Sequence, residues 1–74
     1  MAELEAHETT ARSIGVDDVM QYLAYPEGRE VVREARVVRS VEDWDDDGVW
    51  TVFVYFANGH MIPFLPDEGV VVYR

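Results

Sequence analysis

The side chains best suited to chemistry are the carboxylates at positions 43–48, where the chain reads DWDDDG. The alternating Asp43, Asp45 and Asp47, followed by a glycine, match the opening of a calcium-binding loop, in which oxygen ligands converge on one cation. That pattern needs a bidentate glutamate at its twelfth position, which here is Val54. An acidic loop between strands is therefore the simpler interpretation, and a weak calcium-responsive module is kept as an alternative.

A tryptophan stands inside this acidic run, where no neighbouring apolar residue would bury it. An exposed aromatic side chain among carboxylates has the form of an interface anchor with a charged rim. We therefore predict that this region binds a partner protein, together with aromatic residues of the strand that follows. The predicted partner-binding residues are Glu42, Asp43, Trp44, Asp45, Asp46, Asp47, Phe53 and Tyr55.

Candidates for catalysis or metal binding are few. His7 and His60 are the only histidines, and neither has carboxylates placed to complete a metal site. Ser13 and Ser40 lack a positioned base and a nucleophile elbow, and no phosphate loop, dinucleotide fingerprint or zinc-ligand spacing occurs. We therefore expect no enzymatic activity, no catalytic or metal-binding residue and no cofactor.

The charge of the chain narrows the class of partner. Fifteen acidic residues face six basic ones, all arginine, which gives a net charge of −9 over 74 residues. Such a charge repels phosphate backbones and anionic lipids, so we expect no direct binding of nucleic acid or membrane. It attracts a basic protein surface, because opposite fields steer encounter.

The expected location is the cytoplasm. No stretch is apolar enough to span a membrane, and the first residues lack the basic and apolar regions of a secretory signal. The chain also contains no cysteine, so it has no disulfide that an oxidising compartment would maintain.

The elements that must position the acidic run begin after a polar segment. Residues 1–13 are expected to be a mobile acidic tail, and residues 14–74 a single small α+β domain. Residues 16–25 are predicted to form a helix that ends before Pro26, because the residue preceding a proline avoids the helical region. The apolar face of this helix would consist of Val16, Val19, Met20 and Leu23.

The valine-rich segment at residues 29–42, REVVREARVVRSVE, fits either a helix or a strand. We favour the strand, because β-branched side chains suit a pleated surface. Arginines fall on both faces of such a strand, which indicates a bend or a bulge near its middle.

The clearest feature of the sequence lies at residues 49–65, where two apolar runs flank Asn58 and Gly59. Asn-Gly between strands predicts a hairpin with a two-residue type I′ turn, in which both residues have positive φ. This turn would pair Tyr55 with Ile62. On that register both faces of the hairpin are apolar, and each face needs a cover.

These elements predict an α+β fold, with one N-terminal helix followed by a strongly bent antiparallel four- to five-stranded meander or small open barrel. A short strand at residues 70–73 ends it. A helix of about ten residues is about 15 Å long, whereas hairpin strands of about eight residues span about 26 Å. The helix would leave part of the hairpin exposed, so a partner protein or a homodimer is expected to cover the rest.

The sequence thus predicts a small acidic protein-binding module. In its sharper form this module is an inhibitor that occupies the nucleic-acid-binding surface of a basic partner by copying the negative charge of the nucleic acid. The main alternative is a structural or assembly subunit that forms homo-oligomers through the apolar hairpin face.

Overall fold

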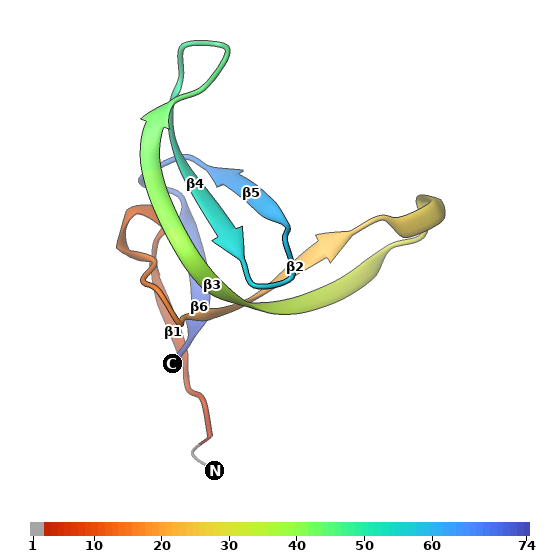
Figure 1. The fold of residues 1–74 in the computed structure, drawn as a ribbon. Coiled ribbons are helices and arrows are strands. Elements are labelled where there is room, and N and C mark those ends of the chain that lie inside the picture. The colour runs from red at the N-terminus through yellow and green to blue at the C-terminus, as the bar shows by residue number, and fades with distance from the viewer. Residues whose placement is uncertain (1–2) are drawn as a thin grey trace.

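A computed structural model describes residues 3–74, which form an antiparallel sheet of six strands with the order β1-β6-β2-β3-β4-β5 (Figure 1). The strands are β1 (Ala6–Thr10), β2 (Val19–Ala24), β3 (Val31–Trp44), β4 (Trp50–Phe56), β5 (Met61–Phe64) and β6 (Gly69–Tyr73). Two 3-10 turns, η1 (Ala11–Ser13) and η2 (Pro26–Gly28), follow β1 and β2.

The predicted helix at residues 16–25 is wrong, and the α+β class is wrong with it. The described part of the chain contains no α-helix, and most of the segment is strand β2. Exposure alternates along β2, with Met20 buried and Gln21 exposed, which is the period of a strand. An isolated helix of this length is marginal. Antiparallel pairing of all six β2 residues with β3, from Val19–Arg36 to Ala24–Val31, satisfies the backbone instead.

The segment expected to be a tail contributes a strand to the sheet. Its first two residues lie outside the described residues. Residues 6–10 form β1, which pairs antiparallel with β6 along its whole length, from Ala6–Tyr73 to Thr10–Gly69. The turn η1 then runs on to Ile14, which is buried.

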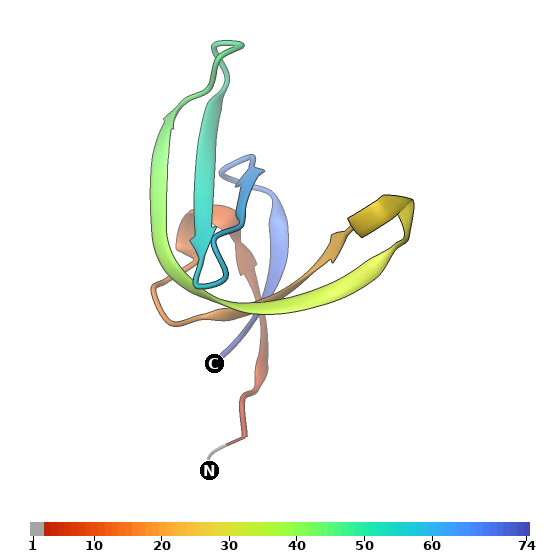
Figure 2. The same ribbon diagram turned by 45° about the vertical axis from the view of Figure 1, so that its right-hand side comes forward.

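The strand interpretation of residues 29–42 is confirmed, and β3 continues to Trp44. The predicted bend is confirmed as well, because the register with β4 shifts between Val37 and Arg39 and leaves Val38 as an extra residue. The first half of β3 pairs with β2 and the second half with β4. The sheet therefore turns a corner along one continuous strand (Figures 1 and 2).

The hairpin of β4 and β5 is confirmed, but its predicted turn type is wrong. A type I′ turn needs positive φ at Asn58, whereas the only described non-glycine residues with positive φ are Asp17 and Glu27. The loop has three residues, closed by Gly59 at φ 88°. This is a type I turn followed by a glycine bulge, the next most common hairpin connection.

The longer loop shifts the register of the hairpin by one residue, so that Tyr55 pairs with Met61 rather than Ile62. A shift of one residue exchanges the faces of a strand. The inner face carries Val52, Val54, Ile62 and Phe64, and the outer face carries Phe53, Tyr55, Met61 and Pro63. Only the inner face packs against the core.

The core enclosed by the bent sheet is small. Its buried apolar side chains are Ala11, Ile14, Met20, Val37, Val52, Val54, Phe56 and Val72. They come from both halves of the sheet, from η1 and from Ile14 directly after it, so β6 and this turn cover the face that a helix was predicted to cover (Figure 2).

A buried carboxylate links the segment before β2 to the end of β6. Asp18 is 6% exposed, and its side chain accepts hydrogen bonds from Nε of Arg74 at 2.9 Å and from the N–H of Gly15 at 2.8 Å. Burial acts to raise the pKa of Asp18, but the bond from Arg74 and the bond from Gly15 together hold it below its ordinary value of 3.8. The carboxylate is therefore ionised in the folded protein.

Replacing Gly59 by Val should destabilise the protein by about 1–3 kcal/mol, because a β-branched residue is strained at positive φ. Urea denaturation checks this. Gly69→Val is the control, since Gly69 lies in a strand and a Cβ there would meet nothing within 4 Å. Equal stability of the two variants would contradict the turn described above.

Replacing Asp18 by Asn should lower the free energy of unfolding by about 1–3 kcal/mol at neutral pH, because the charged hydrogen bond from Arg74 is weakened. The folded-state pKa of Asp18 is lowered. The contribution of ionised Asp18 to the free energy of unfolding is therefore present above the pKa of this residue in the unfolded chain. It is lost as the pH falls through the folded-state pKa. The difference between parent and variant should shrink below about pH 4. Denaturation at a series of pH values measures it, and a difference independent of pH would argue against the ion pair.

Candidate functional site

The tip of the β3–β4 hairpin carries two exposed tryptophans. Trp44 ends β3 rather than standing in a loop, and it pairs directly with Trp50, the first residue of β4. The two rings meet edge to face, with centroids 5.0 Å apart and an interplanar angle of 72°. Trp44 is 63% exposed and Trp50 38% exposed, so the pair forms an apolar surface at the end of the hairpin.

Glu42 holds one of these tryptophans in place. Its Oε2 accepts the indole N–H of Trp50 at 2.8 Å, and its Oε1 accepts Nε–H of Arg12 at 3.0 Å. The bond from Trp50 is the largest cause that lowers the pKa of Glu42; burial opposes it, and the bond and charge of Arg12 add to the lowering. Arg12 also lies 3.7 Å from a carboxylate oxygen of Asp67. The ionised Glu42 thus connects the hairpin tip to η1.

The carboxylates of the loop between β3 and β4 have different roles. Oδ1 of Asp45 accepts the backbone N–H groups of Asp47 at 2.9 Å and of Val49 at 2.8 Å, so this side chain shapes the turn. Asp43 accepts the N–H of Trp44 at 2.8 Å. Within residues 3–74, the side chains of Asp46 and Asp47 take part in no hydrogen bond or ion pair, and both residues are exposed. Their charges are available to a partner.

The geometry does not favour the calcium interpretation of this loop. The described residues contain no group of three or more acidic or histidine side chains close enough to hold a metal ion. Oδ1 of Asp45, a central oxygen of the proposed ligand set, is directed at the backbone N–H groups of its own turn instead.

Two of the predicted partner-binding residues lie elsewhere. Phe53 and Tyr55 alternate with the buried Val52 and Val54, so they point to the opposite face of β4 from Trp50. Both are half-buried, and the guanidinium of Arg39 lies 5.4 Å from the ring centre of Tyr55. The structure therefore brings Glu42, Trp44 and the loop carboxylates together and separates them from the other two aromatic residues.

The structure also contains a polar cluster that the sequence did not indicate. The hydroxyl of Tyr22 lies 2.6 Å from Nδ1 of His60 and accepts a hydrogen bond from Nδ2 of Asn58 at 2.7 Å. The Tyr22 ring stacks on Phe56, with centroids 4.9 Å apart. This cluster fastens β2 to the β4–β5 turn. Tyr22 and His60 are 38 residues apart, so no local pattern could have joined them.

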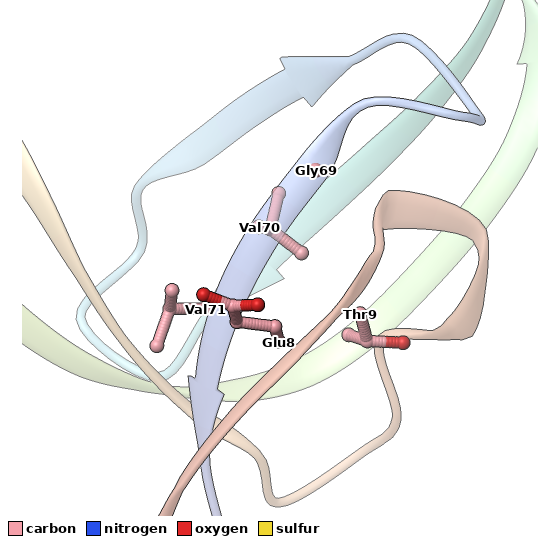
Figure 3. A pocket seen from close by; sticks show the side chains of 5 residues that line it. All are labelled: Glu8, Thr9, Gly69, Val70 and Val71. Atoms are coloured by element: carbon pink, nitrogen blue, oxygen red, sulfur yellow. The ribbon is translucent and has the colours of Figure 1, made fainter.

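A hollow of about 510 Å³ lies beside the β1–β6 pair (Figure 3). Its lining residues are Glu8, Thr9, Gly69, Val70 and Val71. It offers one carboxylate and one hydroxyl from neighbouring positions of a single strand, and it encloses no set of converging polar groups. It lacks the arrangement of a catalytic site.

Comparison of the chain with protein-family models, with curated proteins and with solved structures returned no match. None of the helical turns in residues 3–74 has the length and apolar character to cross a membrane.

Replacing Asp45 by Ala should destabilise the protein by about 1–2 kcal/mol, because two backbone N–H groups of the loop lose their acceptor. Asp46→Ala is the matched control, since it removes the same charge from the neighbouring residue without removing a turn contact. Thermal denaturation compares the two variants. If both variants have the same melting temperature, the hydrogen bonds of Asp45 do not stabilise the turn, and this residue contributes only its charge.

Proposed function

We propose that this protein is a protein-binding module that docks the tip of its β3–β4 hairpin onto a basic surface of a partner protein. The observation that carries the proposal is the exposed pair of Trp44 and Trp50 surrounded by carboxylates. Tryptophan is among the residues most enriched at the energetic centres of interfaces, and a polar rim normally surrounds such centres.

The tryptophan pair is suited to binding because part of it is ordered in advance. The indole of Trp50 is held by Glu42, and the ring of Trp44 rests against Trp50. Side chains that are already ordered lose less conformational entropy when a complex forms. Binding would then bury apolar surface that is now in contact with water.

The loop carboxylates would govern the approach of the partner. Asp46 and Asp47 carry charges that no described cation neutralises, on a chain with a net charge of −9. Charges at the rim of an interface mainly raise the rate of association. In the sharper form of the proposal the basic surface is a nucleic-acid-binding site, and the module inhibits it by occupying the positions of phosphates.

Replacing Trp44 by Ala should increase the rate of dissociation at least tenfold, equivalent to about 1.4 kcal/mol. The matched control is Tyr25→Ala, because Tyr25 is also 63% exposed but lies at the end of β2, away from the tip. Affinity capture with the parent and both variants should identify a protein retained by the parent and Tyr25→Ala and lost with Trp44→Ala. Surface plasmon resonance then measures the rates. Equal capture by all three would exclude the tip as the binding surface.

Replacing Asp46 and Asp47 by Asn should slow association with that partner and flatten its dependence on salt, with little change in dissociation. Adding duplex DNA tests the sharper form, because DNA should displace an inhibitor that occupies a nucleic-acid-binding surface. A complex that persists at saturating DNA would contradict the inhibitory role, while binding to the partner protein would still stand.

Self-assembly is the second candidate, and the exposed area of the chain favours it. The accessible surface is 5255 Å², whereas a monomer of this size exposes about 4,700 Å². The outer face of the β4–β5 hairpin, with Phe53, Tyr55 and Met61, has no described element packed over it. Oligomers that persist in high salt, measured by sedimentation, would favour this assembly, since apolar association is not weakened by screening.

A further inference from the structure

The sheet is split between β2 and β6. These two strands share one pair, Val19–Tyr73. Beyond it β2 pairs only with β3, while β6 pairs only with β1. The β2–β3 arm therefore diverges from β6, as both ribbon views show (Figures 1 and 2).

The split leaves backbone groups of β6 without a neighbouring strand. Glu5 and Arg74 exchange both backbone hydrogen bonds, at 2.7 and 2.9 Å, and the N–H of Ala11 donates to the C=O of Glu68. Hydrogen-bonded pairs alternate in an antiparallel ladder. The backbone N–H and C=O groups of the even-numbered residues of β6 therefore point to β1. The N–H of Val71 therefore faces the split, where the ladder with β2 has already ended.

A groove of about 440 Å³ occupies the split. Its apolar lining comes from three strands and includes Met20 and Leu23 of β2, Ile62 and Phe64 of β5, and Val70 and Val71 of β6. Among the described residues that line it, Glu68 is the one charged side chain. The groove thus combines an unpaired strand edge, apolar walls and a carboxylate.

We propose that this groove binds an extended peptide segment of a partner protein as an added strand along β6. Strand addition obtains affinity from backbone hydrogen bonds and specificity from alternate side chains. The segment would present apolar side chains at alternate positions to the groove and an arginine or lysine to Glu68.

A second copy of this chain fits the groove less well than a basic peptide. Apart from the edge at the split, the free edges of the described sheet belong to β1 and β5. Strand β1 carries Glu8 and would add a second carboxylate to a groove whose one charged side chain is Glu68. Strand β5 contains Pro63, which has no N–H to donate. Two chains of net charge −9 also repel each other, whereas a basic segment is attracted.

The site is separate from the proposed function, because its lining includes neither Trp44, Trp50 nor the loop carboxylates. Loss of peptide binding would leave docking through the hairpin tip untouched, and loss of docking through the tip would leave the groove untouched.

The test compares two proline variants at paired positions. Val71→Pro removes the N–H that faces the groove. Glu8→Pro is the matched control, because Glu8 is paired with Val71 in the register and its N–H faces the free edge of β1. Neither N–H belongs to the β1–β6 ladder, and proline is tolerated at such edge positions.

The probe is a synthetic peptide of alternating valine and threonine with one arginine near its end, and fluorescence anisotropy measures its binding. We expect Val71→Pro to weaken binding at least tenfold and Glu8→Pro to leave it unchanged. A peptide with glutamate in place of arginine should bind at least tenfold more weakly to the parent, and Glu68→Gln should remove most of that preference.

Amide exchange on the unmodified protein gives an independent measurement if Val71→Pro fails to fold. The N–H of Val71 should exchange rapidly in the free protein and at least tenfold more slowly with the peptide bound. The proposal is overturned if the peptide does not bind at millimolar concentration, if both proline variants bind it equally, or if the exchange rate of Val71 does not change. Sedimentation showing a dimer that Val71→Pro disrupts would assign the groove to a second copy instead.

Discussion

The corner in β3 at Val37 is the constraint on which the rest of the structure depends. The C=O of Val37 accepts a hydrogen bond from the N–H of Asp17 at 2.8 Å, and the N–H of Val37 donates one to the C=O of Asp18 at 2.7 Å. Both partners lie in the segment before β2. The adjacent C=O of Arg36 accepts the N–H of Ala57, beyond the end of β4. Since Val37 is also fully buried, the strand is held at the point where it changes partner from β2 to β4.

This corner explains why so much apolar surface stays exposed. One long strand supports two hairpins that diverge, so the chain has a radius of gyration of 12.7 Å, against about 11 Å for a compact domain of this length. The largest fully buried side chains are four valines. The tryptophans at one hairpin tip and the groove beside β6 are both consequences, because each lies where the divergent strands leave the core.

Part of the candidate site was predictable from neighbouring residues, and part of it depends on contacts between strands. The exposure of Trp44 follows from its acidic neighbours, and the structure agrees with it. The role of Trp50 was missed, because its contact with Glu42 depends on the register of β3 with β4, and the Arg12 that braces Glu42 is 30 residues away from it. Tyr55 was assigned to the same surface, but strand alternation turns it to the opposite face.

The sequence by itself determined the elements whose signals are local: the strand from Val31, its bulge, the hairpin at Gly59 and the acidic turn. Each depends on side-chain branching, arginine placement or the conformational freedom of glycine and aspartate within a few residues. Tertiary structure decided that residues 19–24 form a strand and that residues 6–10 add to the sheet beside β6. Those outcomes depend on pairing with distant strands, because a short segment adopts the conformation that satisfies its backbone hydrogen bonds in the assembled sheet.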